Sequence, residues 1–132
     1  MRNSLKLIQT ILILVFTLTS CLSLGDGSNT IIKESANKRQ DKKAVLFLRQ
    51  AGATVSDSYQ VTVMEYDTKF DTTSVGNTFT VDTDHGKTFL DSTSIDLSWL
   101  SNDTLEIIYN KKLRTFVQKM KVAGVTIIYK AR

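Results

Sequence analysis

The feature that most constrains the fold of this chain is a period-two alternation of apolar and polar residues along roughly its last 90 residues. Apolar residues occupy every second position at 59–63, 79–81, 95–99 and 105–109, with polar residues at most positions between them. Successive side chains of a β-strand point to opposite faces, so this pattern gives each strand one apolar face. The sequence therefore predicts an all-β domain.

Turn-forming residues divide this stretch into strands. The continuous apolar run from Ala44 to Arg49 predicts a central strand, which Gly52-Ala53-Thr54 ends. Gly76-Asn77 opens a later strand. The clearest hairpin runs from Ile95 to Tyr109, because Ser101-Asn102-Asp103 at its centre is typical of a turn.

The C-terminal part continues the pattern with one ambiguity. Asn110-Lys111-Lys112 predicts a turn, and Thr115 to Val122 predicts a strand. A helix over Leu113 to Met120 is the alternative, because nothing there breaks one. Gly124 indicates either a bulge or a tight turn before a last strand that starts at Val125.

Six or seven short strands in this order predict a small antiparallel sandwich or barrel over residues 44–132. Hydrophobic residues make up 42% of the chain and Cys occurs once, which excludes disordered and disulfide-scaffold classes. The predicted core consists of Val45, Phe47, Val61, Val63, Phe79, Val81, Ile95, Leu97, Trp99, Leu105, Ile107, Val125 and Ile127.

The N-terminal residues 1–20 have the order of a signal peptide. Arg2 and Lys6 give a cationic start, and no acid occurs before Asp26. The apolar stretch from Leu7 to Leu18 is shorter than the about 20 residues that a membrane span needs. A cationic start, an apolar middle and a small-residue end indicate a cleaved secretion signal.

The end of that signal, Leu18-Thr19-Ser20-Cys21, resembles the bacterial lipobox. The resemblance implies that a signal peptidase recognises Leu18, Thr19 and Ser20 and cleaves before Cys21. It also implies a diacylglyceryl thioether on Cys21 and a lipidated new N-terminus. Two or three acyl chains make membrane attachment effectively permanent, whereas one chain holds only marginally.

Lipidation at Cys21 implies a location in the cell envelope. In cells with two membranes, an Asp after the lipidated Cys often resembles an inner-membrane retention signal. Leu22 stands there instead, which favours the outer membrane. In a cell with one membrane, the protein would sit on the outer face of that membrane.

Residues 21–43 are polar and weakly patterned, so we expect a flexible tether between the anchor and the domain. Ile31 and Ile32 are apolar exceptions within it. The tether is expected to act as a plain spacer; the alternative is that its cluster of basic residues binds anionic head groups. These residues are Lys33, Lys38, Arg39, Lys42 and Lys43.

Charge is divided unevenly along the chain. Residues 57–106 carry ten acidic and two basic side chains, whereas residues 107–132 carry seven basic and no acidic ones. We expect acidic and basic strands to lie side by side and form cross-strand ion pairs. The alternative is a basic C-terminal face for an anionic membrane or glycan. A secreted, lipidated chain rarely meets nucleic acid, so no nucleic-acid partner is expected.

Chemical motifs are sparse. His85 is the only histidine, and Asp82-Thr83-Asp84-His85-Gly86 lacks the further oxygen ligands of a calcium loop, so we expect a solvated turn there. Trp99 continues the alternation of its strand and is expected in the core rather than in a ligand platform. The sequence predicts no metal, no cofactor and no catalytic residue. A glycan hydrolase that uses two carboxylates is the remaining enzyme hypothesis.

A second resemblance supports the lipoprotein interpretation. Gly52-Ala53-Thr54, Gly76-Asn77, Trp99 and Asp103-Thr104-Leu105 look like a family of short, uncharacterised bacterial lipoproteins. The resemblance implies an envelope lipoprotein with no known activity or substrate.

The resulting hypothesis is a non-enzymatic, lipid-anchored binding or interaction module of the cell envelope. Its partners would be the membrane, through the lipid on Cys21, and an envelope protein or glycan. The alternative is an inhibitor or immunity-type protein that blocks an enzyme acting on the envelope.

Overall fold

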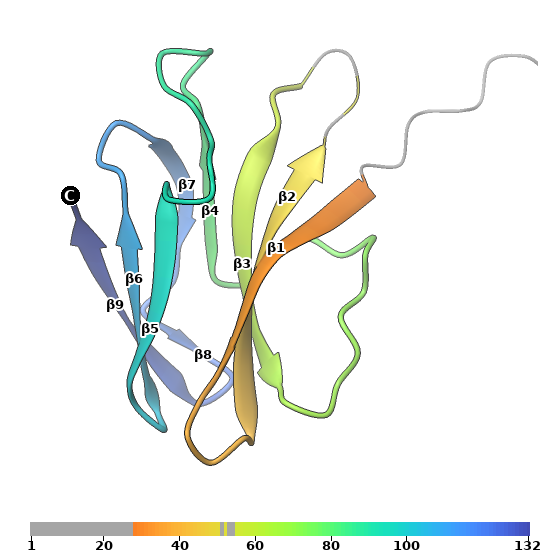
Figure 1. Ribbon diagram of the computed structural model, residues 1–132, viewed down its shortest axis with the longest axis vertical. Coiled ribbons are helices and arrows are strands. Elements are labelled where there is room, and N and C mark those ends of the chain that lie inside the picture. The colour runs from red at the N-terminus through yellow and green to blue at the C-terminus, as the bar shows by residue number, and fades with distance from the viewer. Residues whose placement is uncertain (1–27, 51, 53–54) are drawn as a thin grey trace, which may run out of the picture.

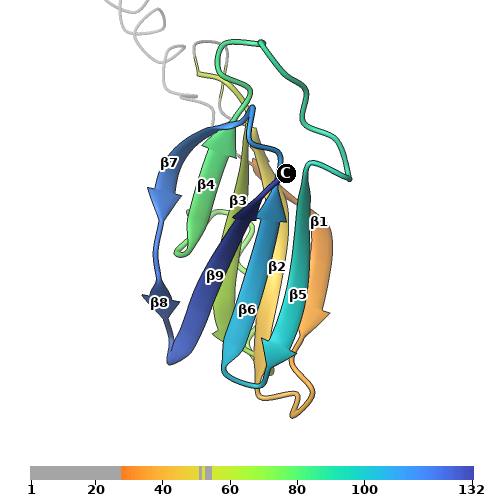
Figure 2. The ribbon, with the colours of Figure 1, turned by 90° about the vertical axis from the view of Figure 1, so that its left-hand side faces the viewer.

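Two β-sheets packed face to face make up the part of the chain that the structure, a computed structural model, describes: residues 28–50, 52 and 55–132 (Figures 1 and 2). The five-stranded sheet has the order β1 (Ser28–Ala36), β2 (Lys42–Gln50), β3 (Ser58–Glu65), β4 (Phe79–Asp82) and β7 (Arg114–Gln118). The four-stranded sheet has the order β5 (Ile95–Ser101), β6 (Thr104–Tyr109), β9 (Val125–Ala131) and β8 (Lys121–Val122). The described residues contain no helix, so the prediction of an all-β, sandwich-like fold is confirmed.

The strand count and one strand pairing differ from the sequence prediction. Residues 28–132, as far as the structure describes them, contain nine strands instead of six or seven, because β1 was not expected and the predicted strand 115–122 is divided into β7 and β8. At that division the Lys119 amide donates to the Thr78 carbonyl in one sheet, and the Met120 carbonyl accepts from the Ile127 amide in the other. The chain thus changes sheets there, and β9 returns parallel to β6, whereas all other strand pairs are antiparallel.

The tether predicted over residues 21–43 is wrong from Ser28 onward. β1 pairs along its length with β2, with a bulge between Ile31 and Lys33, so the domain includes at least the 16 residues before the predicted start at residue 44. β1 is an edge strand whose side chains are mostly exposed, which explains why it lacks a clear apolar pattern. The basic residues assigned to the tether belong to β1, β2 and the turn between them.

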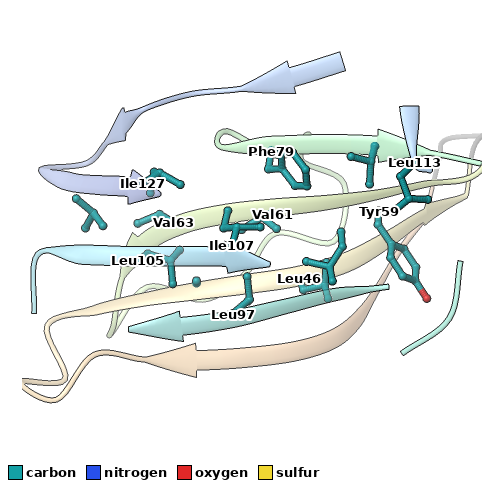
Figure 3. Packing of buried hydrophobic residues seen from close by; sticks show 14 residues of the cluster. Leu46, Tyr59, Val61, Val63, Phe79, Leu97, Leu105, Ile107, Leu113 and Ile127 are labelled. Atoms are coloured by element: carbon teal, nitrogen blue, oxygen red, sulfur yellow. The ribbon is translucent and has the colours of Figure 1, made fainter. Parts of the chain in front are cut away.

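The core lies between the sheets and is lined by alternate residues of both (Figure 3). Twelve of the 13 predicted core residues are buried, and Trp99 is partly buried against the same cluster. β2 is buried on both faces, as expected for a central strand: Leu46 faces the main core, whereas Val45 and Phe47 pack with Phe70 on the other face.

Contacts between the sheets close one side of the sandwich. On the side of β1 and β5, the indole Nε1 of Trp99 donates to the Ser35 carbonyl at 3.0 Å, and Lys33 forms an ion pair with Asp96. The buried Asn37 side chain donates to the Asn102 carbonyl at 2.9 Å, linking the β1–β2 turn to the β5–β6 turn. The predicted hairpin from Ile95 to Tyr109 is confirmed as β5 and β6.

One end of the sandwich, here called the loop end, gathers most of the long connections (Figure 1). β1 begins there, and strand register places Arg49, Ser58, Asp82 and Arg114 along the same line across the sheet. The Thr83–Ser94 loop, the 110–113 turn and the end of β9 therefore also lie at the loop end, because Ile95 pairs with Tyr109 and Tyr109 with Ala131. The opposite end, with the β1–β2 and β5–β6 turns, is called the far end.

Candidate functional site

The outer face of the five-stranded sheet is divided into a covered half and an open half. Tyr59, Val61 and Val63 of β3 point into the core, so Gln60 and Thr62 point outward. The loop between β3 and β4 covers part of this outer face, where the Phe70 ring packs on Phe47 with their centroids 4.9 Å apart. The rest of the outer face toward the loop end is open.

The open half forms a cleft of about 480 Å³. Its floor comes from outward-facing residues of β3, β4 and β7, and its rim from the loops at the loop end. The residues that line it include Arg49, Ser58, Gln60, Thr80, Asp82, His85, Arg114 and Phe116. A volume of this order is typical of clefts that bind small ligands.

Arg114 is the centre of the charged cluster in this cleft. Its Nε and Nη2 atoms donate to the two carboxylate oxygens of Asp82, at 3.1 and 2.5 Å. The Nη1 atom lies 3.0 Å from Nε2 of His85, which accepts because a guanidinium only donates. The guanidinium also lies 4.6 Å from the centroid of the Phe116 ring. Arg114 thus links β4, the following turn and its own strand.

The Asp82 carboxyl is held in its charged form by this cluster. Burial raises its pKa, but the hydrogen bonds from Arg114 and the Asp84 amide, together with the charge of the Arg114 guanidinium, outweigh burial and lower the pKa overall. Asp84 beside it also has a lowered pKa, first because of the hydrogen bond from Lys87. A carboxyl that donates a proton near neutral pH needs a raised pKa, so neither Asp82 nor Asp84 is suited to that role.

Two further cleft residues hold the covered half in place. Nη1 of Arg49 donates to Oδ1 of Asn29 and to the Thr73 carbonyl, both at 3.1 Å. Oε1 of Gln60 accepts from the Gly76 amide at 2.7 Å. In contrast, Oγ1 of Thr80 is buried at the cleft and has no hydrogen-bond partner among the described residues.

The predicted solvated turn at 82–86 is correct in part. Asp84, His85 and Gly86 adopt the left-handed backbone conformation of a tight turn, with φ values of 50°, 60° and 82°. Asp82, however, is only 3% exposed and belongs to the cleft. No group of three or more His, Cys, Asp and Glu side chains able to hold a metal ion occurs among the described residues.

Arg114 and Phe116 were not singled out in the sequence. The only signal for them in the sequence was the expected pairing of acidic and basic strands. The Asp82–Arg114 pair fits that expectation, but the sequence does not say which residues face each other. Three other acids of the 57–106 segment pair instead with bases near the N-terminus. These pairs are Lys33–Asp96, Arg39–Asp103 and Lys42–Glu65.

The predicted lipidation site Cys21 and its recognition residues Leu18, Thr19 and Ser20 lie outside the described residues, as do Ala53 and Thr54. The part of the chain from Ser28 onward that the structure describes has no helix long and apolar enough to cross a bilayer.

Comparison of the chain with protein-family models, with curated proteins and with solved structures found no match. The resemblance to short bacterial lipoproteins therefore stays a prediction from the residues that carry it. The fold and the cleft together define a small β-sandwich with an open, polar and aromatic cleft on the outer face of one sheet.

Proposed function

We propose that this protein is a lipid-anchored binding module of the cell envelope, without catalytic activity, and that its cleft binds an envelope glycan. The anchor is the lipid on Cys21, which the lipobox resemblance implies. The observation that carries the binding role is the cleft itself, where the exposed Phe116 ring lies among polar side chains, including the Ser58 hydroxyl with a proton left to donate.

Sugars suit this combination because each ring has an apolar C–H face and a rim of hydroxyl groups. The Arg114 guanidinium stacks over the Phe116 ring, but the Phe116 side chain is still 56% exposed, so its open part offers an apolar surface to the C–H face of a sugar ring. The Ser58 hydroxyl accepts from Gln60 at 2.9 Å and keeps its own proton to donate.

Binding is favoured over glycan hydrolysis because of the ionisation of the acids at this cleft. Hydrolysis requires one carboxyl that stays protonated near neutral pH and a second that is charged. Asp82 and Asp84 both have lowered pKa values and both lie near the Arg114 guanidinium. Their environment therefore supports recognition of a polar ligand rather than proton transfer to it.

The test is a nuclear magnetic resonance titration of the Cys21→Ser protein with disaccharide-peptide fragments of peptidoglycan, up to about 5 mM, the weak end of measurable affinity. We expect chemical-shift changes confined to the amides of β3, β4 and β7 that surround the cleft. Phe116→Ala should weaken binding about tenfold, equal to about 1.4 kcal/mol. Met120→Ala, at a similarly exposed apolar residue away from the cleft, is the matched control.

Four results would count against the proposal. No shift at the highest concentration, or shifts on the four-stranded sheet alone, would remove the cleft as a glycan site. Turnover of the fragments that an Asp82→Asn or Asp84→Asn change abolishes would establish the hydrolase hypothesis. A tight one-to-one complex with a glycan-cleaving enzyme, with loss of its activity, would establish the inhibitor hypothesis.

A further inference from the structure

We propose that the loop end of the sandwich rests on the membrane, with the Phe89 side chain inserted among the lipid head groups. This inference rests on the proposed function, because it takes the lipid on Cys21 as the anchor. It concerns which surface of the domain faces the bilayer, which the lipobox alone does not specify. The partner of this surface is a lipid bilayer with anionic head groups.

The position of β1 sets how far the domain can move from its anchor. The strand begins at Ser28, so only residues 22–27 separate it from Cys21. At no more than about 3.6 Å per residue, this connection spans at most about 25 Å. The nine residues of β2 alone extend over about 30 Å. The loop end, where β1 begins, is therefore held close to the bilayer, at high effective concentration.

The loop end also carries the most exposed large apolar side chain among the described residues. Phe89, in the Thr83–Ser94 loop, is 83% exposed, and Val55 in the neighbouring connection is 65% exposed. Exposure of these apolar side chains to water is unfavourable, whereas the head-group region accepts aromatic and aliphatic side chains. Because they lie at the anchored end of the domain, both side chains are placed where they can contact the bilayer.

The loop that carries Phe89 is fixed by its own hydrogen bonds. On one side, the Thr88 amide donates to the Thr83 carbonyl at 3.2 Å, and Lys87 forms an ion pair with Asp84 at 2.8 Å. On the other side, the Ser94 hydroxyl donates to the Phe89 carbonyl at 3.3 Å. A preordered loop loses little conformational entropy on insertion, which favours insertion of its apolar tip.

Charge at the loop end is compatible with an anionic surface. The Asn110 amide donates to the Ser94 carbonyl at 3.0 Å, so the 110–113 turn lies beside the Phe89 loop. In that turn Lys111 and Lys112 are exposed and form no ion pair with any described residue. Acids are present too: Asp57 is exposed, whereas Asp84 is paired with Lys87, and Asp91 accepts hydrogen bonds from the Thr93 amide and hydroxyl. The two free lysines remain for lipid phosphates.

This orientation has a consequence for the cleft. The rim of the cleft includes Val55 and His85, which belong to connections at the loop end. With that end on the membrane, the cleft opens sideways just above the head groups. A glycan would then reach it along the membrane surface rather than from the far side of the domain.

The experiment uses full-length protein, purified from membranes and reconstituted into phosphatidylethanolamine–phosphatidylglycerol vesicles. Phe89→Cys and Met120→Cys each add one thiol for an environment-sensitive fluorophore. Met120 is the matched control, since it is 65% exposed and lies away from the loop end, next to β8. Nitroxide-bearing lipids then quench fluorophores at the head-group level, and mass spectrometry reports acylation of Cys21.

We expect acylated Cys21, a blue-shifted fluorophore at position 89, and quenching there at least threefold stronger than at position 120. Acylation with equal quenching at both positions, or stronger quenching at 120, would overturn the orientation and leave the anchor intact. In that case Phe89 would be assigned to a protein partner. Unmodified Cys21 would overturn the orientation and the proposed anchor together.

Discussion

At the scale of single residues, Gly76 and Asn77 show how the covered half of the outer face is attached to the sheet. The Asn77 side chain pairs with the Val63 backbone as a peptide group would, through Nδ2–O and N–Oδ1 distances of 2.9 and 3.0 Å. The Gly76 backbone lies so close to β3 that a Cβ atom there would come within 2.9 Å of the Gln60 Cβ and 3.1 Å of the Val61 carbonyl. The sequence marked these two residues as a strand opening but not as an attachment.

Gly76→Ala should therefore destabilise the domain, because both close atoms belong to or adjoin the backbone and cannot move freely. We expect a loss of about 1–3 kcal/mol in the free energy of unfolding, measured by urea denaturation. Gly52→Ala is the control, since nothing lies within 4 Å of a Cβ added there. Equal stability of the two variants would show that the approach at Gly76 is looser than described.

Asp82 gives the second prediction at this scale. Because its pKa is lowered in the folded protein, its stabilising contribution is complete above the unfolded pKa of about 4 and is lost as the pH falls through the folded value. Asp82→Asn should cost about 1 kcal/mol at pH 7, a modest value because Arg114 is 37% exposed. The difference from wild type should shrink as the pH falls below 4 in urea titrations. A difference that stays constant down to pH 2 would contradict this role.

Sequence patterns predicted burial better than they predicted partners. Alternation and the continuous apolar run at 44–49 identified twelve of the core residues, because burial on a strand follows directly from side-chain direction. The cleft depends on which strands are neighbours, and Asp82 and Arg114 are 32 positions apart in the chain. No local pattern specifies that pairing, so the sequence pointed to opposite charges without identifying this cluster.

At the scale of elements, the β8–β9 connection decides between the two conformations that the sequence allowed at Gly124. The sequence allowed a bulge or a tight turn at Gly124, and the structure has a two-residue turn in which Val122 pairs with Val125. Both turn residues have positive φ, 49° at Ala123 and 79° at Gly124. This is the geometry of a type I′ hairpin turn, which favours Asn-Gly.

Ala123→Asn should therefore stabilise the protein, because Asn tolerates the left-handed conformation better than Ala. We expect a gain of about 0.5–1 kcal/mol in the free energy of unfolding. Gly124→Ala should have the opposite sign, since it places a Cβ on a residue with φ of 79°. Destabilisation by Ala123→Asn would mean that the turn is not of this type.

β1 is the element that the sequence missed, because an exposed edge strand needs no apolar face and its pairing is made by the backbone. A chain of residues 28–132 should fold cooperatively, whereas one of residues 42–132 should aggregate or unfold. Without β1, the apolar β2 would become an open edge, and the Trp99 hydrogen bond to Ser35 would be lost. Fluorescence of Trp99, the only tryptophan, reports both effects. Equal unfolding midpoints for the two chains would show that the domain does not need β1 and would support the predicted start at residue 44.

At the scale of the whole molecule, the all-β sandwich could be predicted from the sequence, but its chain path could not. Alternation predicts strands without specifying which sheet each strand joins. The change of sheet at Lys119 and Met120 depends on backbone hydrogen bonds to two different partners, Thr78 and Ile127. The parallel pairing of β6 with β9 follows from that change of sheet.

At the scale of the whole molecule, the anchor, the loop end and the cleft would act together. The lipid on Cys21 would hold the loop end near the bilayer, the Phe89 loop would contact it, and the cleft would face sideways for a glycan. Each part has a separate test, and the membrane anchor is the one on which the orientation depends.

The most direct measurement is metabolic labelling of cells with a clickable fatty acid, comparing wild type with Cys21→Ala, followed by membrane fractionation. We expect label and membrane association in the wild type only, because the Cys21 thiol is the sole thiol of the chain and the proposed attachment point for lipid. Equal label in both proteins, or none in either, would contradict a lipid-anchored module.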